Sequence, residues 1–175
     1  RWHMRQNLSV IIPAYKEEHR IERCIRDSLS FLRGHPTIGK FELLFVADVS
    51  GDKTIELIQK YQRQHREIKL IVNPQREQKG GSVKIGMLHA EYDVLLFYDV
   101  DLSTPLDEIT RALNYLKEYD VVIGSRALPE SRVQKDFLKT VLSTGFSVLK
   151  WLVLGLPYKD TQCGFKMFRS STRII

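Results

Sequence analysis

The chain has 175 residues, of which 43% are hydrophobic and 27% are charged, and it carries a formal net charge of +6. This length suits one domain with a sizeable core, and the composition excludes a disordered or low-complexity chain. A pI near 9.3 indicates anionic partners such as nucleotides, acidic lipid headgroups or nucleic acid, without choosing among them.

The cysteines and the start of the chain bear on its context. Because the chain begins at Arg1, we expect it to be a segment of a longer protein, and no secretory signal is recognised at its start. Cys24 and Cys163 are too few for a disulfide framework and lack the spacing of a metal site. A reducing compartment is therefore the simplest context.

Apolar, β-branched runs alternate with amphipathic segments from the start of the chain. The run Leu8–Ile12 predicts a buried strand ended by Pro13, and Ile21–Leu32 predicts a helix. One face of this helix is apolar or small, with Ile21, Cys24, Ile25, Ser28, Leu29 and Leu32. The next predicted strand is Phe41–Val46, and the helix after it has an inner stripe of Ile55, Ile58 and Tyr61.

The same alternation continues to residue 124. The predicted strands are Ile68–Val72, Val94–Tyr98 and Val121–Gly124. Between them we expect a helix with Ser82 as its N-cap that ends near Glu91, and a helix that begins at Asp107 with Ile109, Ala112, Leu113 and Leu116 facing inward. This pattern predicts a single three-layer α/β domain over residues 1–175, with a largely parallel sheet.

Polar side chains follow four of the predicted strands at their carboxyl ends. They are Tyr15 and Glu17, Asp48 and Asp52, Asp99 and Asp101, and Ser125 and Arg126. In open α/β sheets, ligands bind in the crevice beyond the carboxyl ends of the strands. The sequence therefore predicts that these residues form one site.

The pair Asp99 and Asp101 follows the apolar run Val94–Tyr98 directly. Alternation along an extended strand end would point the two carboxylates the same way. Two hard oxygen ligands at this edge suit Mg²⁺ or Mn²⁺, with a phosphate completing the coordination shell. The alternative is an ordinary strand end and turn before the helix that begins at Asp107.

The alternation ends after the fifth predicted strand. Residues 126–136 form a polar, charged loop of a length that is typical of functional lids. Residues 137–157 are strongly apolar, with Lys139 and Lys150 as the only charges. The position of Lys150 argues against a membrane span and favours an amphipathic helix at a membrane interface. A helix packed within the protein is the alternative.

Five segments in this order resemble the motifs of the family 2 glycosyltransferases, which have the GT-A fold. They are Ser9–Glu18, Lys79–Val83, Asp99–Pro105, Gly124–Arg126 and Asp160–Phe168. The last segment is similar to the branch that glycosylates polyprenyl phosphates, in particular to the dolichyl-phosphate β-glucosyltransferases, with the mannosyl enzymes next. The resemblance covers the chain from about Leu8 to Phe168.

The resemblance implies a role for each matched residue. Asp99 and Asp101 would bind Mg²⁺ or Mn²⁺. The acceptor phosphate would meet Ser125, Arg126 and Arg132, while Gln162 would border the sugar and acceptor. Asp101, Arg126 and Gln162 would be the catalytic residues. The nucleotide sugar would contact Pro13, Ala14, Tyr15, Glu17, Asp48, Lys79, Gly80, Asp99 and Val100.

The resemblance also implies an activity and a location. We expect an inverting transfer of a hexose from UDP-glucose to a polyprenyl phosphate at the cytoplasmic face of a membrane, with no nucleic-acid partner. The alternatives are transfer from GDP-mannose and a sugar-nucleotide-binding module without catalysis. A phosphoacceptor receiver-like module fits poorly, because Pro13-Ala14-Tyr15 replaces the acid pair that it needs.

Three positions depart from the family pattern. Ala47 replaces the first of two acids after the second strand, which leaves base recognition and donor identity open. Lys16 replaces the usual Asn before Glu17. Ser103 stands where the mannosyl branch has Gln, which favours the glucosyl branch.

Overall fold

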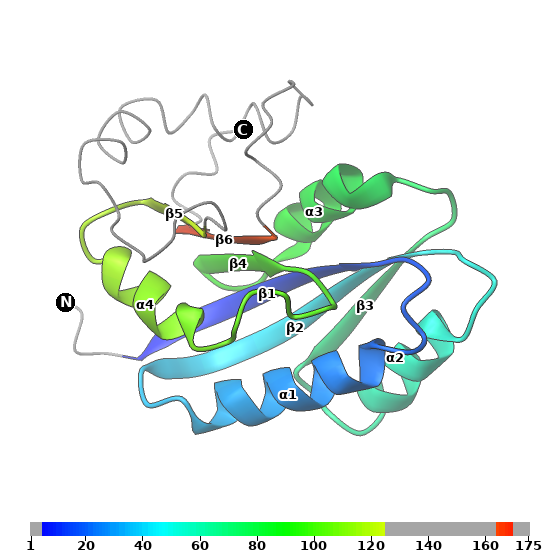
Figure 1. Cartoon of the computed structure of the whole chain (residues 1–175), viewed down its shortest axis with the longest axis horizontal. Helices are drawn as coiled ribbons and strands as arrows, with labels where there is room; N and C mark the ends of the chain where they lie inside the picture. The colour runs from blue at the N-terminus through cyan, green and yellow to red at the C-terminus, as the bar shows by residue number, and fades with distance from the viewer. Residues whose placement is uncertain (1–4, 125–163, 170–175) are drawn as a thin grey trace.

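The computed structural model describes residues 5–124 and 164–169, which form one sheet flanked by helices (Figure 1). The strands are β1 (Gln6–Ala14), β2 (Ile38–Asp48), β3 (Ile68–Asn73), β4 (Val94–Tyr98), β5 (Val121–Ile123) and β6 (Phe165–Arg169). The helices are α1 (Ile21–Gly34), α2 (Thr54–Gln62), α3 (Gln78–His89) and α4 (Glu108–Tyr115). The strands lie in the order β3-β2-β1-β4-β6-β5.

Four neighbouring strands, β1 to β4, run parallel. β1 pairs with β2 on one side and with β4 on the other, and β2 pairs with β3. Val10, Ile11 and Ile12 are fully buried, as expected for a strand covered on both faces. β1 does not end at Pro13 but continues to Ala14, and its pairing with β4 stops at Ile11, so Pro13 pairs with β2 alone. The predicted three-layer, largely parallel α/β architecture is confirmed.

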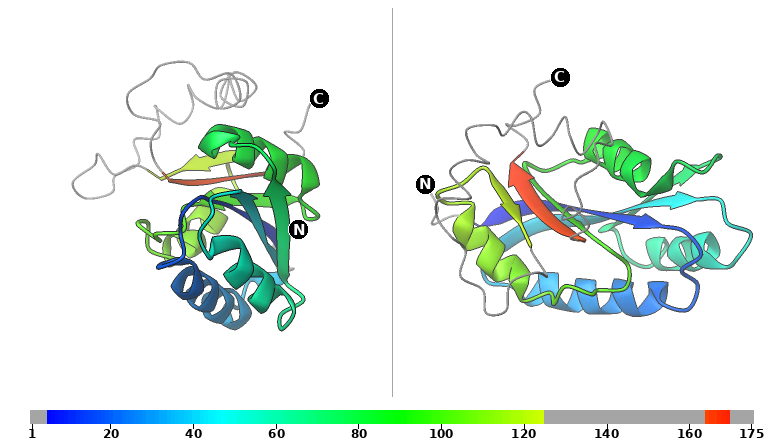
Figure 2. Two further views of the ribbon diagram at one scale, coloured as in Figure 1. Left: turned by 90° about the vertical axis from the view of Figure 1, so that its right-hand side faces the viewer. Right: turned by 45° about the horizontal axis from the view of Figure 1, so that its top comes forward.

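Helices cover both faces of the sheet (Figures 1 and 2). α1, α2 and α4 contribute to one hydrophobic cluster, whereas α3 contributes to a second cluster on the opposite face. The buried face of α1 is the predicted one, made of Ile21, Cys24, Ile25, Ser28, Leu29 and Leu32. Periodicity alone therefore identified how α1 packs.

Helix α3 begins earlier than its sequence predicts. It starts at Gln78, so Ser82 is not its N-cap but lies in its second turn. The Ser82 hydroxyl lies 3.3 Å from Asp48 Oδ1 and from Asn73 Nδ2, which belong to β2 and β3. The Ser82 side chain thus binds the sheet and does not cap its own helix.

Strand β6 is an element that the sequence patterns do not predict. It lies antiparallel between β4 and β5, which makes the sheet mixed at this edge. Phe165, Met167 and Phe168 are buried, and so is Lys166, with 6% of its surface exposed. Five residues with a lysine among the apolar ones do not give a clear alternating pattern.

The regions 126–136 and 137–157 lie outside the described residues, so the expected lid and interface helix stay predictions. Within residues 5–124 and 164–169, none of the helices is both long and apolar enough to cross a bilayer.

Candidate functional site

A pocket of about 310 Å³ opens at the carboxyl ends of β1, β2 and β4, beside the first turn of α3. This is the crevice where α/β sheets bind ligands. Nine residues predicted for the nucleotide and metal line it, namely Pro13, Ala14, Tyr15, Glu17, Asp48, Lys79, Asp99, Val100 and Asp101. Gly80 is exposed on α3 next to Lys79 and is not part of the lining.

Four further residues line the pocket, namely Arg20, Arg76, Gln78 and Ser82. The sequence analysis did not identify them as site residues. Arg20 and Arg76 are isolated basic residues in polar segments, and no local pattern distinguishes them from solvated surface charges. Gln78 has a positive φ of 59°, which is unusual for a residue other than glycine. Backbone strain of this kind is frequent at ligand sites.

Asp99 and Asp101 belong to a turn and not to an extended strand end. β4 ends at Tyr98, and the Leu102 amide donates to the Asp99 carbonyl at 3.1 Å. Val100, between the two aspartates, is buried in the core. Both aspartates line the same pocket, as expected, but the strand alternation given as the reason is wrong.

The Asp99 carboxylate is paired with a cation from the opposite wall of the pocket. Lys79 Nζ lies 2.7 Å from Asp99 Oδ2, and it also lies 5.2 Å from the centroid of the Phe97 ring. Asp101 is exposed, and its Oδ1 accepts a hydrogen bond from the Ser103 amide at 2.9 Å. The charge of Asp99 is therefore neutralised by Lys79 of α3, whereas the Asp101 carboxylate is held by a hydrogen bond within its own turn.

Asp48 is held from two sides at the end of β2. It is buried, and its Oδ1 accepts hydrogen bonds from Asn73 Nδ2 at 2.8 Å and from Ser82 Oγ at 3.3 Å. Buried carboxylates require such partners. Ala47, which stands where the family has another acid, is fully buried in the core cluster.

Tyr15 presents an aromatic ring to the pocket in the loop after β1. The guanidinium of Arg76 lies 4.4 Å from the ring centroid, which is a cation–π distance. Lys16 Nζ lies 5.5 Å from the same centroid, and Lys16 has a positive φ of 55°. Aromatic and basic groups are thus brought together from the loops after β1 and β3.

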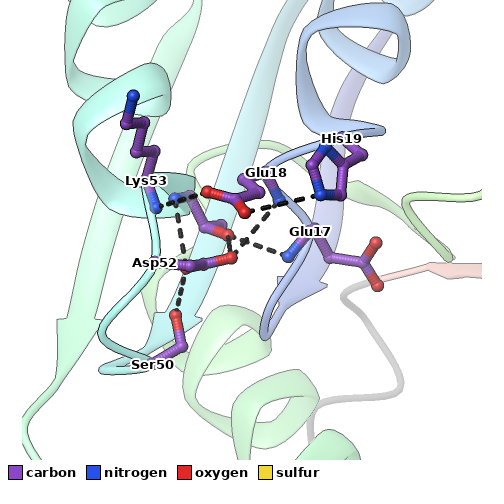
Figure 3. A network of polar contacts seen from close by, with 7 residues as sticks. Glu17, Glu18, His19, Ser50, Asp52 and Lys53 are labelled. Atoms are coloured by element: carbon purple, nitrogen blue, oxygen red, sulfur yellow. Dashed lines mark hydrogen bonds and ion pairs between the residues drawn. The ribbon is translucent and has the colours of Figure 1, made fainter.

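A network of hydrogen bonds ties the loop after β1 to the loop after β2 (Figure 3). The Glu17 amide donates to Thr54 Oγ1 at 2.8 Å, and the same hydroxyl donates to Asp52 Oδ2 at 2.7 Å. The Glu18 amide donates to Asp52 Oδ2 at 3.4 Å, and Glu18 Oε2 accepts from the Lys53 amide at 3.1 Å. Thr54 is fully buried at the centre of this network.

The pKa values of Glu17 and Asp52 are shifted in opposite directions. Burial raises the pKa of Glu17, and the negative charges of Asp101 and Asp99 act in the same direction against the Arg20 ion pair at 2.7 Å. Burial would also raise the pKa of Asp52, but hydrogen bonds within the network outweigh it and lower the pKa. A cation that entered the pocket near Asp99 and Asp101 would therefore also favour ionised Glu17.

The residues of the pocket fit a divalent metal that is shared with a phosphate ligand. Among the residues that the structure describes, no three His, Cys, Asp or Glu side chains form a complete metal site. Mg²⁺ is commonly held by one or two carboxylates together with phosphate oxygens and water. Asp99 and Asp101 supply such carboxylates, and the Lys79 ammonium on Asp99 shows that this position accepts a cation.

The remaining predicted residues, Ser125, Arg126, Arg132 and Gln162, lie outside the described residues. Their roles stay predictions.

Solved glycosyltransferase structures share this fold. The mannosyltransferase PcManGT from Pyrobaculum calidifontis, in complex with GDP-Man and Mn²⁺, aligns with a TM-score of 0.65 at 17% identity over 98% of this chain and 48% of its own. Glucosyl-3-phosphoglycerate synthase from Mycobacterium tuberculosis, in complex with UDP, aligns with a TM-score of 0.58 at 18% identity over 95% of this chain and 57% of its own. The fold is that of the GT-A glycosyltransferases.

Curated sequences show a nearer relationship. The dolichyl-phosphate beta-glucosyltransferase of Drosophila melanogaster is 36% identical, with 94% of this chain and 55% of that protein covered. The human protein of the same name is 30% identical, with 93% and 55% covered. The chain thus spans about half the length of the curated relatives it matches. The profile of the family described as "Glycosyl transferase family 2" matches residues 9–173, and the chain belongs to this family.

Proposed function

We propose that this chain carries the catalytic domain of an inverting glycosyltransferase that moves glucose from UDP-glucose to dolichyl phosphate. The single observation that carries the proposal is the pocket that brings Tyr15, Lys79, Asp99 and Asp101 together at the carboxyl edge of the sheet. The curated relatives named dolichyl-phosphate beta-glucosyltransferase support the choice of sugar and acceptor.

The pocket offers distinct groups for each part of the donor. Tyr15 provides a flat surface on which the uracil base can stack, and Asp48 provides a carboxylate for the ribose or base. Arg76 and Lys79 provide positive charge for the diphosphate. Pro13, Ala14, Glu17 and Val100 line the pocket beside these groups, and Gly80 keeps the exposed start of α3 free of a side chain.

Asp99 and Asp101 would hold Mg²⁺ or Mn²⁺ together with the donor diphosphate. When bound, this metal supplies positive charge that stabilises the departing nucleoside diphosphate. Lys79 Nζ, which lies 2.7 Å from Asp99 Oδ2, would form an ion pair with an oxygen of the diphosphate when the metal is bound. The exposed Asp101 carboxylate is accessible from the open side of the pocket.

The acceptor is expected to need little activation. The second pKa of a phosphate monoester is about 6, so a polyprenyl phosphate is largely dianionic near neutral pH. Arg126 and Arg132 would orient it with fork-shaped donors, together with Ser125, while Gln162 would border the sugar. Attack from the face opposite the leaving group inverts the anomeric carbon. A lipid acceptor places the enzyme at a membrane, for which we propose the cytoplasmic face.

The decisive experiment compares Asp101→Ala with the matched control Asp107→Ala, an exposed aspartate further along the same loop. Transfer is measured with a panel of nucleotide sugars, including UDP-glucose and GDP-mannose, and a polyprenyl phosphate in the presence of Mn²⁺. We expect transfer from UDP-glucose, a loss of about 100-fold or more in Asp101→Ala, and no loss in Asp107→Ala.

The other outcomes each identify an alternative. Full activity of Asp101→Ala would refute the metal assignment, and an α-linked product would refute inversion. Transfer from GDP-mannose alone would identify a mannosyltransferase. Metal-dependent nucleotide binding without transfer to any acceptor would identify a binding module.

A further inference from the structure

Gly164 lies directly beside the carboxylate of Asp99. It immediately precedes β6, whose first residue, Phe165, pairs with Tyr98 at the end of β4. A Cβ atom added at Gly164 would lie 2.1 Å from Asp99 Oδ2 and 2.9 Å from Asp99 Cγ. Contacts this short cannot be accommodated without moving the carboxylate or the backbone.

The carboxylate is held on its other side by Lys79. The same oxygen, Asp99 Oδ2, accepts from Lys79 Nζ at 2.7 Å. Asp99 Oδ2 is therefore enclosed between an ammonium group from α3 and the bare Cα of Gly164. The closeness of the carboxylate gives a reason of space for a glycine at this position.

We propose that Gly164 is a positioning residue for Asp99. Its missing side chain leaves the room in which the carboxylate reaches Lys79 and in which it would hold the metal bound to the donor diphosphate. The inference rests on the proposed function, since it assigns Gly164 a part in binding the metal–nucleotide complex. It also gives the antiparallel strand β6 a role, because β6 brings a residue from the far end of the chain against the Asp99–Asp101 turn.

The first test is binding, measured by calorimetry as the affinity for UDP-glucose with Mn²⁺ and with EDTA. Gly164→Ala is expected to weaken the Mn²⁺-dependent affinity by about 10- to 100-fold, as for other residues that orient a metal ligand. The control is Gly34→Ala at the end of α1, where, apart from its chain neighbours and the backbone of α1, no heavy atom of the described residues lies within 4 Å of the added Cβ. This control is expected to bind like the wild type.

The second test is a double-mutant cycle on thermal stability, which needs neither metal nor activity. Asp99 Cβ lies 3.7 Å from the added Cβ, an ordinary contact distance, so Asp99→Ala removes the clash. Gly164→Ala is expected to lower the melting temperature by about 2–4 °C in the wild type. Gly164→Ala should lower the melting temperature equally in the Asp99→Asn background, where the size of the side chain is kept. It should not lower the melting temperature in the Asp99→Ala background.

The outcomes separate this inference from the proposed function. If the wild type shows no Mn²⁺-dependent binding of UDP-glucose, the proposed function fails and the role of Gly164 fails with it. If the wild type binds and Gly164→Ala binds equally well, only the role of Gly164 is overturned. A loss of stability that persists in Asp99→Ala would also overturn it, because Gly164 would then act through another contact.

Discussion

Tyr15 shows how the surroundings of a side chain distinguish it from an ordinary surface residue. As a residue in a polar loop it could be an ordinary surface aromatic, but in the structure it lines the pocket and carries Arg76 on its ring at 4.4 Å. An exposed cation–π contact contributes about 0.5–1 kcal/mol. This contact therefore orders the ring without preventing a base from replacing the guanidinium.

We predict that Tyr15→Ala weakens UDP binding, because it removes the ring on which we propose that the uracil base stacks. Stacking of a base on an aromatic ring contributes about 1–3 kcal/mol by alanine substitution. Tyr15→Phe keeps the ring and should bind within about twofold of the wild type. Calorimetric titration with UDP measures both. Equal loss in the two variants would mean that the hydroxyl, and not the ring, makes the contact.

Cys24 gives a prediction that concerns reactivity alone. It is fully buried on α1, and burial raises the pKa of its thiol from 9.0 to about 12. Its thiolate fraction at pH 8 is then about a thousandfold below that of an exposed cysteine. Peptide mass spectrometry after iodoacetamide treatment should find Cys24 unmodified in the native protein and modified in urea. Rapid native modification would contradict the packing of α1.

Two elements are joined by the network around Thr54. The hydroxyl of Thr54 links the start of α2 to the loop that carries Tyr15 and Glu17. It satisfies the Glu17 amide and donates to Asp52 at the same time. The position of the loop after β1 therefore depends on a residue that does not line the pocket.

We predict that Thr54→Val lowers the free energy of unfolding by about 1–3 kcal/mol, because it removes the acceptor of the part-buried Glu17 amide and one of the hydrogen bonds to Asp52. The same variant should weaken UDP-glucose binding, since the loop after β1 loses its anchor. Thr54→Ser keeps the hydroxyl and is expected to restore binding. Urea denaturation and nucleotide titration measure the two effects. Unchanged binding in Thr54→Val would show that the network serves stability alone.

His35 joins the end of α1 to α4. Its Nε2 lies 2.8 Å from Thr110 Oγ1, and its Nδ1 lies 3.3 Å from the Thr37 amide, which donates to it. An acceptor Nδ1 requires the neutral ring. Burial lowers the pKa of His35 below its ordinary value of 6.5, so the folded protein resists protonation of this side chain.

This shift predicts a loss of stability in mild acid. As the pH falls through 6.5, the unfolded chain takes up a proton at His35 that the folded protein does not, so the free energy of unfolding decreases until the lower folded pKa is reached. His35→Gln should remove this part of the pH dependence, whereas His89→Gln, at an exposed position on α3, should keep it. Urea denaturation at pH 7.5, 6.5 and 5.5 measures it. An unchanged slope in His35→Gln would refute the assignment.

At the scale of the whole molecule, the pocket joins the carboxyl ends of three strands to α3. A ligand bound there contacts elements from both faces of the sheet, so binding should stabilise the entire fold. At a ligand concentration 100-fold above Kd the expected gain is about 2.7 kcal/mol. For a chain of 175 residues this corresponds to a rise in melting temperature of about 5–10 °C.

We predict this rise with UDP-glucose and Mn²⁺ together, and a smaller one when EDTA replaces Mn²⁺. Asp101→Ala should melt like the wild type without ligand but lose the Mn²⁺-dependent part of the rise. Differential scanning calorimetry measures the melting temperature of both proteins without ligand, with UDP-glucose and Mn²⁺, and with UDP-glucose and EDTA. The same rise with EDTA as with Mn²⁺ would contradict the proposed metal.

Much of the sheet and of the site could be predicted because the signals are local. The run Val94–Tyr98 is β4 with the predicted bounds, and the acids that follow it line the pocket as expected. Parallel strands bring their carboxyl ends to one edge, so recognising the strands was sufficient to place Glu17, Asp48, Asp99 and Asp101 together. The motifs that resemble family 2 glycosyltransferases added the roles that geometry alone does not supply.

Only the tertiary structure decided which distant residues complete the site. Arg76 is brought onto Tyr15, Ser82 onto Asp48, and Gly164 onto Asp99, across separations in the chain that carry no periodic signal. β6 was not predicted, because its burial depends on its pairing with β4 and β5 and not on a pattern in its own residues. The sequence by itself determined the layers and the edge that holds the acids, since these follow from local periodicity. The partners of those acids depend on packing between elements, which no local pattern encodes.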